Sequence, residues 1–274
     1  MEYLKSFFDI KDRVAVLSGG GGILAGEMAK GLLNSGAKVV LLDINKDNLD
    51  KKVKELKQTD HEIIGLQCDV LDEEKLRNVN NEILSKFGHI DILVNAAGGN
   101  MTSATIDIGQ NVFDLKIENF KKVTDLNLIG TVLPTLIFGE DMAKEKSGSI
   151  INISSMASTS VITRVVGYSA AKAAIDNFTK WMAVELAQKF GDGLRVNAIA
   201  PGFLITDQNR RLLTNEDGSL TQRGKTILDI TPFKRFGEPE EMVGTVLWLA
   251  SDASRFVTGA VIPIDGGFSV FSGV

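Results

Sequence analysis

Residues Arg13–Gly26 read RVAVLSGGGGILAG, a short apolar run followed by four consecutive glycines and the start of a helix-like segment. Glycine lets the backbone turn sharply and approach a ligand, and the helix N-terminus that follows offers free N–H groups to a phosphate. A glycine turn between a strand and a helix is the setting in which proteins bind a dinucleotide. The same residues are also compatible with a tight turn that binds nothing.

Six further apolar runs follow the first one along the chain. Each is short, rich in Val and Ile and apolar on both faces, which is typical of strands in a parallel sheet covered by helices on both sides. Helix-length segments separate the runs, and this alternation predicts βαβ units in an α/β fold. We therefore expect a single doubly wound Rossmann domain over residues 1–274, with a seven-stranded parallel sheet. The predicted strands are Arg13–Ser18, Lys38–Leu42, Ile63–Gln67, Ile90–Val94, Ser149–Ile153, Leu194–Ala200 and Val261–Ile264.

The segments between the strands predict helices over Gly26–Asn34, Lys46–Gln58, Asp72–Phe87 and Tyr168–Lys189. The last of these carries one apolar stripe at spacings of three and four residues. Residues 203–238 are the least regular part of the chain, because NEDGS and TQRGK interrupt the helical pattern. Long loops in compact domains often cover a binding site, so we expect a substrate lid here. The first residues are expected to form a tail.

The composition excludes several classes of protein. The chain has 274 residues, with 35 acidic against 30 basic side chains and a net charge of −5, so nucleic acid is not expected as a partner. It contains no apolar stretch of the length that spans a membrane and no secretory signal. Cys68 is the only cysteine, which fits a reducing compartment and predicts a cytoplasmic protein. His61 and His89 stand too far apart for a zinc motif, and no metal site is expected.

Polar residues stand where several predicted strands end. Asp43 follows the second strand at the distance from the glycine turn at which an acid accepts hydrogen bonds from ribose hydroxyls. Asp69 and Val70 follow the third strand, and Asn95–Gly98 follows the fourth. Open α/β sheets bind their ligands at this edge. For Asp43 the alternative is an N-cap of the next helix.

Tyr168 is the one tyrosine outside the N-terminal segment, and Lys172 follows it by one helical turn. A neighbouring ammonium favours the phenolate and is expected to lower the tyrosine pKa, which suits general acid–base catalysis. Ser154 and Ser155 end the fifth predicted strand and are expected near the phenol. A Tyr/Lys pair on a helix also occurs by chance, so it gains weight only together with the serines and the glycine turn.

Taken together, these motifs resemble the short-chain dehydrogenase/reductase family along nearly the whole chain. The matching elements are Tyr168-x-x-x-Lys172, Ser155 thirteen residues earlier, Asn95–Gly98, Asn127 in DLNLIGT, Pro201-Gly202 with Thr206, and Asp265-Gly266-Gly267. The resemblance implies a strand order of 3-2-1-4-5-6-7. It also implies hydride transfer between nicotinamide C4 and a carbonyl or alcohol carbon.

The resemblance assigns roles to four residues at the reaction centre. Tyr168 would exchange the proton, and Ser155 would hydrogen-bond the substrate oxygen. Lys172 would lower the tyrosine pKa and bind the nicotinamide ribose. Asn127 would hold a water molecule in the proton relay.

The implied cofactor is NAD(H), because Asp43 would repel the 2′-phosphate of NADP(H) while no Arg or Lys within Gly19–Gly26 compensates. The family's turn usually reads TGxxxGxG, and here Ser18, Ile23 and Ala25 replace its threonine and later glycines. The expected cofactor contacts are Gly19, Gly20, Gly22, Ile23, Leu24, Asp43, Asp69, Val70, Asn95, Ala96, Ala97, Gly98, Tyr168, Lys172, Pro201, Gly202, Leu204 and Thr206.

Within the family, several stretches after Gly148 are similar to the D-mannonate oxidoreductase (fructuronate reductase) branch. This predicts a sugar-acid substrate, whose carboxylate arginines would bind; Met101–Leu115 would form one wall of the pocket. The candidate substrate residues are Asn100, Arg164, Gln208 and Arg210. The family also implies a homotetramer, with Trp181 as an interface anchor. The alternatives are a gluconate 5-dehydrogenase, a 3-oxoacyl carrier-protein reductase, or a non-catalytic Rossmann protein that senses NAD(H).

Overall fold

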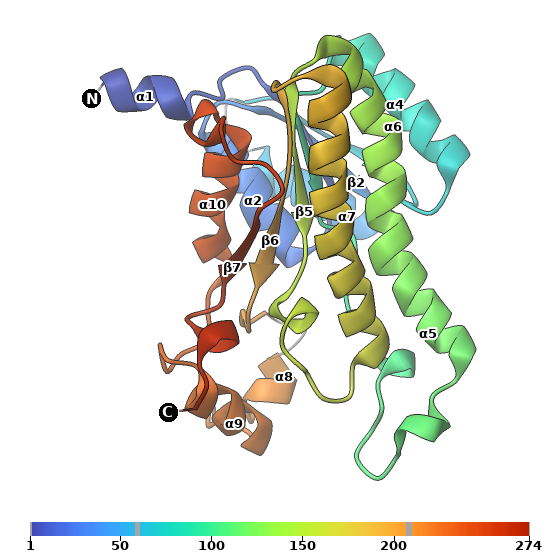
Figure 1. The fold of residues 1–274 in the computed structure, drawn as a ribbon, viewed down its shortest axis with the longest axis vertical. Helices are drawn as coiled ribbons and strands as arrows, with labels where there is room; N and C mark the ends of the chain where they lie inside the picture. Colours follow the sequence, from blue (N-terminus) through green and yellow to red (C-terminus); the bar gives the residue numbers. More distant parts are fainter. Residues whose placement is uncertain (1, 58–60, 207–209, 274) are drawn as a thin grey trace.

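In the computed structural model, which describes residues 2–57, 61–206 and 210–273, seven parallel strands form one sheet in the order β3-β2-β1-β4-β5-β6-β7 (Figure 1). This confirms the predicted fold class, strand count and strand order. Boundaries differ from the prediction by at most two residues. The strands are β1 (Val14–Ser18), β2 (Lys38–Asp43), β3 (Ile63–Gln67), β4 (Ile92–Asn95), β5 (Gly148–Ile153), β6 (Leu194–Pro201) and β7 (Val261–Ile264).

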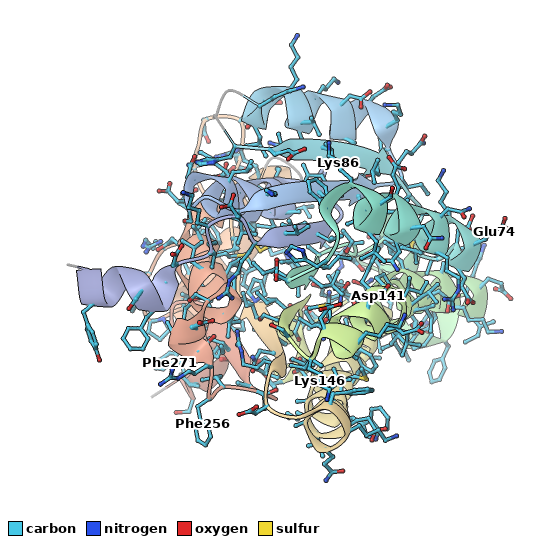
Figure 2. The ribbon with its side chains drawn as sticks, turned by 90° about the horizontal axis from the view of Figure 1, so that it is seen from above. Glu74, Lys86, Asp141, Lys146, Phe256 and Phe271 are labelled. Atoms are coloured by element: carbon cyan, nitrogen blue, oxygen red, sulfur yellow. The ribbon has the colours of Figure 1, made fainter. Side chains whose placement is uncertain are left out.

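Helices cover both faces of the sheet, as the βαβ alternation requires. Side chains of β1 alternate between the two layers: Ala15 and Leu17 pack on one face, and Val14 and Val16 on the other. Figure 2 shows Glu74 of α4 on one side of the molecule, opposite the exposed Phe256 and Phe271 beyond α10. The first layer contains α2 (Ile23–Asn34), α3 (Lys46–Leu56) and α10 (Val243–Ala250); the second contains α4 (Glu73–Phe87), α6 (Gly130–Glu145) and α7 (Val166–Phe190).

The two edge strands are less buried than the sequence predicted from their apolar residues. β1 is fully buried, but β3 and β7 consist largely of partly exposed residues. Their sequences are as apolar as those of the central strands, yet each has a neighbouring strand on one side only. Burial at a sheet edge depends on what covers that edge, which a strand's own sequence does not determine.

Helix α7 carries the predicted apolar stripe. Ala171, Ile175, Met182 and Leu186 are buried against the sheet, and burying a Leu or Ile side chain stabilises a fold by about 1.5–3 kcal/mol. Trp181 lies outside this stripe and is 59% exposed. The structure therefore excludes a core position for Trp181.

Two segments are more regular than the sequence suggested. The expected N-terminal tail is helix α1 (Glu2–Phe8), and the expected lid contains α8 (Arg210–Leu213) and α9 (Gln222–Ile230). The sequence TQRGK begins α9 rather than interrupting it, because the Thr221 hydroxyl caps the helix by accepting a hydrogen bond from the Gly224 N–H at 3.0 Å. A Cβ at Gly224 would stand 2.2 Å from the Leu213 carbonyl oxygen, so glycine is needed where α9 packs on α8.

The remaining elements are short. Helix α5 (Ile117–Thr124) continues into α6 through one π-helical turn at Asp125–Ile129, and 3₁₀ turns occupy Thr102–Ala104, Val112–Asp114, Met156–Ser158, Pro239–Met242, Asp252–Ser254 and Phe268–Val270. Among the helices of the described residues, none has both the length and the apolarity needed to cross a membrane.

Candidate active site

A cleft of about 770 Å³ opens at the carboxyl ends of the strands, a size typical of small-molecule sites. Segments that follow β1 through β6 all contribute to its wall. The predicted cofactor residues that line it are Gly19, Gly22, Ile23, Leu24, Asp43, Asp69, Val70, Ala96, Ala97, Gly98, Tyr168, Pro201, Gly202, Leu204 and Thr206.

The glycine turn brings bare backbone to the wall of the cleft. Gly19 has a φ of +68°, and a Cβ there would stand 2.9 Å from the Ala96 carbonyl oxygen. Gly22 is the N-cap of α2, and neither a side-chain cap nor an acid occupies the first turn of this helix. Its first N–H groups are therefore available to an anion. Gly20 packs against Leu41 instead of lining the cleft, and the neighbouring Gly21, which sequence reasoning missed, lines it.

Ser18 stands where the family pattern has threonine, and its hydroxyl has a structural role. The Ser18 hydroxyl accepts hydrogen bonds from the backbone N–H groups of Ala96 and Ala97, both at 3.1 Å. It thereby joins the end of β1 to the segment after β4. A hydroxyl is what this contact needs, and serine supplies it as threonine does.

Asp43 stands at the end of β2 with its carboxylate at the cleft. Oδ2 accepts a hydrogen bond from the Gly21 N–H at 2.9 Å, and Oδ1 accepts one from the Asn45 N–H at 2.8 Å. Asn45, not Asp43, is the N-cap of α3, so the alternative interpretation of Asp43 is wrong. A glycine cradle, a bare helix N-terminus and a carboxylate beside them fit the pyrophosphate and ribose of a dinucleotide.

Asn95 does not line the cleft, although its neighbours do. Its amide Nδ2 donates to Thr135 Oγ1 and Asn152 Oδ1, both at 2.8 Å, within the protein interior. Side chains alternate along a strand, and Asn95 is the last residue of β4, so its side chain faces the helices. The predicted cofactor contact is therefore replaced by a buried link between β4, β5 and α6.

Ser155 and Tyr168 both line the cleft, and the Ser155 hydroxyl acts on the pKa of the phenol. Ser155 follows β5, and Tyr168 lies in the first turn of α7. The Ser155 Oγ accepts a hydrogen bond from the Ala157 N–H at 3.1 Å. The serine hydrogen therefore remains available for the phenol or for a substrate oxygen.

Lys172 lies behind Tyr168, not in the wall of the cleft. Its Nζ donates to the Ile153 carbonyl oxygen at 2.7 Å and stands 5.5 Å from the centroid of the Tyr168 ring. Burial lowers the pKa of Lys172 to about 8, and the nearby charge of Asp176 opposes this fall. Asp176 is itself buried and accepts a hydrogen bond from Ser154.

The pKa of Tyr168 differs from the expectation. Burial raises it above the ordinary value, and the nearby Ser155 hydroxyl opposes the rise. The sequence predicted a lowered pKa from the nearby lysine, but the Lys172 ammonium donates to the Ile153 carbonyl oxygen. Burial of the phenol is therefore the main cause of the shift.

Asn127 is fully buried in the π-helical turn between α5 and α6. Its Oδ1 accepts from the Gly99 N–H at 3.0 Å, and its Nδ2 donates to the carbonyl oxygens of Gly99 and Val123. These bonds hold the segment after β4 in place. One lone pair of Oδ1 is left for the relay water, which stays a prediction.

The candidate substrate residues are distributed unevenly. Asn100 lines the cleft and donates to Thr105 Oγ1 at 2.7 Å. Arg164 binds the Ile106 carbonyl oxygen at 2.8 Å and Asp107 Oδ1 at 2.5 Å, so its guanidinium is bonded to the loop after β4. Arg210 begins α8, is exposed and is not among the residues lining the cleft. Gln208 lies outside the described residues.

Sequence reasoning missed the cationic residue in the wall of this cleft, Arg223 in the first turn of α9. The capping signal of Thr221, three residues before Gly224, could have placed Arg223 on a helix. Nothing local indicates which way that helix faces. The walls also include the apolar residues Met156, Ile162, Val165, Phe203 and Leu212.

Two other chemistries were weighed. Burial raises the pKa of the Cys68 thiol to about 11, so this cysteine is not an activated nucleophile. Across the described ranges, no group of three or more His, Cys, Asp or Glu side chains is arranged to hold a metal ion. Beside the glycine turn, the cleft offers the Ser155 and Tyr168 hydroxyls for proton exchange, a combination typical of dinucleotide-dependent oxidoreductases.

Comparisons with known proteins agree with this class. The family profile described as enoyl-(acyl carrier protein) reductase matches residues 22–269. An uncharacterized oxidoreductase, UxuB, of Bacillus subtilis (strain 168) is 44% identical over 275 residues, which cover 97% of this chain and 98% of the relative. A 3-oxoacyl-[acyl-carrier-protein] reductase of Synechocystis sp. is 36% identical over 94% of this chain and 98% of its own.

A crystal structure with bound NAD, of a Haemophilus influenzae protein provisionally named D-mannonate oxidoreductase, superposes with a TM-score of 0.92. It is 42% identical, and the match covers 97% of this chain and 98% of that one. The chain belongs to the short-chain dehydrogenase/reductase family. It is an oxidoreductase that acts on alcohol or carbonyl groups.

Proposed function

We propose that this enzyme transfers a hydride between NAD(H) and a sugar acid, interconverting D-mannonate and D-fructuronate. The observation that carries the proposal is that Ser155 and Tyr168 line the same cleft as the glycine turn and Asp43. The NAD bound to the Haemophilus protein supports the cofactor, and the name of that protein supports the substrate.

The glycine turn, Asp43 and the segments after β3, β4 and β6 would hold the dinucleotide. When bound, the nicotinamide supplies or accepts the hydride at the reacting carbon. Asp43 favours NAD(H), because a carboxylate accepts hydrogen bonds from ribose hydroxyls and repels a 2′-phosphate. The acid and its backbone contacts to Gly21 and Asn45 form one preorganised unit.

The proton side of the reaction belongs to Tyr168. In the reduction, the phenol Oη gives its proton to the substrate oxygen as negative charge develops there, and in the oxidation it accepts that proton back. Ser155 donates a hydrogen bond to the same oxygen. Lys172 and Ser155 are the groups that stabilise the phenolate between the two protonation states.

The assembly and surroundings are also proposals. The exposed Trp181 on α7 supports a homotetramer with this helix at an interface. The single buried Cys68 supports a cytoplasmic location. We further propose that residues 1–274 act as one domain whose segment 203–238 covers the substrate.

A substrate panel tests the function directly. Purified enzyme with NADH is expected to reduce D-fructuronate far more efficiently than D-fructose, acetoacetyl thioesters or 5-keto-D-gluconate, as followed by loss of NADH absorbance. With NAD, D-mannonate is expected to be oxidised in preference to D-gluconate. Equal reduction of fructose and fructuronate would refute the sugar-acid assignment, and a clear preference for the thioester would indicate a 3-oxoacyl carrier-protein reductase.

A further inference from the structure

Arg223 of α9 lines the cleft. It occupies the first turn of α9, which the Thr221 side chain fixes through its bond with the Gly224 N–H. The charge of Arg164, four residues before Tyr168, acts on Arg223, whereas Asp43 and Asp69 follow β2 and β3 at the other end of the sheet. We therefore assign Arg223 to the substrate half of the cleft.

The charges in the cleft are divided between its halves. Among the described residues that line it, Asp43 and Asp69 carry the negative charge and Arg223 carries the positive charge. Other arginines form ion pairs: Arg13 with Asp252, Arg164 with Asp107, and Arg235 with Glu241. Within the described ranges, no acidic side chain forms an ion pair with Arg223.

The surroundings of Arg223 disfavour its charge. The guanidinium is partly buried, and burial together with the nearby positive charge of Arg164 lowers its pKa. Arg164 is anchored by Asp107 and the Ile106 carbonyl oxygen, so it cannot turn away without losing these bonds. A partly buried guanidinium with no ion-pair partner among the described residues, in a cleft wall shared with apolar residues such as Ile162 and Leu212, is an arrangement that an anion stabilises.

We propose that Arg223 is the specificity-determining residue that binds the substrate carboxylate. A guanidinium binds a carboxylate through two parallel charge-assisted hydrogen bonds, and a partly desolvated one binds it more strongly than an exposed one. This inference rests on the proposed function and replaces Arg210 in the role that the sequence suggested for it.

Helix α9 would then take part in substrate recognition. A carboxylate bound to Arg223 would connect α9 to the cleft that Ser155 and Tyr168 also line. A neutral sugar lacks this contact and leaves α9 without a partner in the cleft. The carboxylate thus contributes to affinity.

The test compares Arg223→Met with Arg223→Lys, using Lys225→Met on the exposed side of α9 as the matched control. For Arg223→Met we expect KM for D-fructuronate to rise about 10- to 150-fold, the range for a lost hydrogen bond to a charged group. Turnover of D-fructose, which carries a CH₂OH in place of the carboxylate, should stay unchanged. Arg223→Lys should recover part of the affinity, and Lys225→Met should change KM less than about twofold, as surface substitutions do.

Fluorescence titration of each variant with NADH shows whether Arg223 binds the substrate carboxylate or the cofactor pyrophosphate. An unchanged Kd for NADH with a raised KM for fructuronate supports the carboxylate site. A weakened Kd for NADH with an unchanged ratio of acid to neutral substrate efficiency would show that Arg223 binds the cofactor pyrophosphate, and would overturn the inference.

Two negative results have different meanings. If the wild type prefers fructuronate and Arg223→Met keeps that preference, the inference about Arg223 fails while the proposed function stands. If the wild type shows no preference for the acid over fructose, the proposed function fails and the inference fails with it.

Discussion

The two halves of the cleft are built in different ways. The half beside β1, β2 and β4 is made largely of backbone: a glycine turn, a helix N-terminus and one carboxylate held by two backbone N–H groups. The half beside β5, β6 and α9 is made of side chains: Ser155, Tyr168 and Arg223. Backbone at a strand end is fixed by the sheet, whereas a side chain such as Arg223 on the short helix α9 can change without disturbing the sheet. The first half can therefore serve a common cofactor while the second is free to determine the substrate.

Replacing Tyr168 by Phe should have the largest effect, because it removes the proton donor from the side-chain half while keeping the ring. General acid–base catalysis contributes about 10²- to 10⁴-fold in rate, and kcat should fall by at least this factor. Tyr3→Phe is the matched control, since Tyr3 is 76% exposed. NADH titration should give an unchanged Kd for both variants; a Tyr168→Phe enzyme with more than a tenth of the wild-type kcat would contradict the assignment.

Asp43→Ala tests the backbone half and should have an intermediate effect. The carboxylate accepts hydrogen bonds from Gly21 and Asn45 and is expected to accept others from the ribose. Losing bonds of this kind costs about 10- to 150-fold in affinity, so KM for NADH should rise and the preference over NADPH should narrow. Asp47→Ala, an exposed acid in the first turn of α3, should leave both unchanged. Equal kcat/KM for the two cofactors in the wild type would show that Asp43 does not select between them.

Asp176→Asn should have the smallest effect, a displacement of the pH profile. Burial lowers the pKa of Lys172 to about 8 and the Asp176 charge opposes this fall, so the neutral amide should lower the pKa further. Lys172 is protonated below its pKa. Activity that depends on its ammonium should therefore decline at a lower pH in the variant than in the wild type, in kcat/KM measured from pH 6 to 10. The control is Asp192→Asn, at an exposed position after α7, which should leave the pH profile unchanged. If Asp176→Asn also leaves the profile unchanged, Asp176 has no influence on Lys172.

The different construction of the two halves of the cleft also explains which site residues could be placed from the sequence and which could not. Asp43 and the glycine turn could be placed because they follow apolar strands whose order fixes where they end. The same argument placed Asn95 at the cleft. Asn95 is the last residue of β4, however, and its side chain faces the helices. Arg223 could not be placed, because the direction in which α9 faces depends on the close contact of Gly224 with Leu213. Likewise, the pKa of Tyr168 depends on how dry its surroundings are, which spacing to a lysine does not reveal.

The buried thiol in the wall of the cleft has a practical consequence for labelling. Cys68 is the only cysteine of the chain, and with a pKa of about 11 only about one molecule in 10⁴ is a thiolate at pH 7. Maleimide reagents should therefore leave the wild-type protein unlabelled. A cysteine introduced by Lys225→Cys on the exposed face of α9 would then react alone, and a fluorophore there would report the position of the lid segment during turnover without removal of any native residue from the cleft.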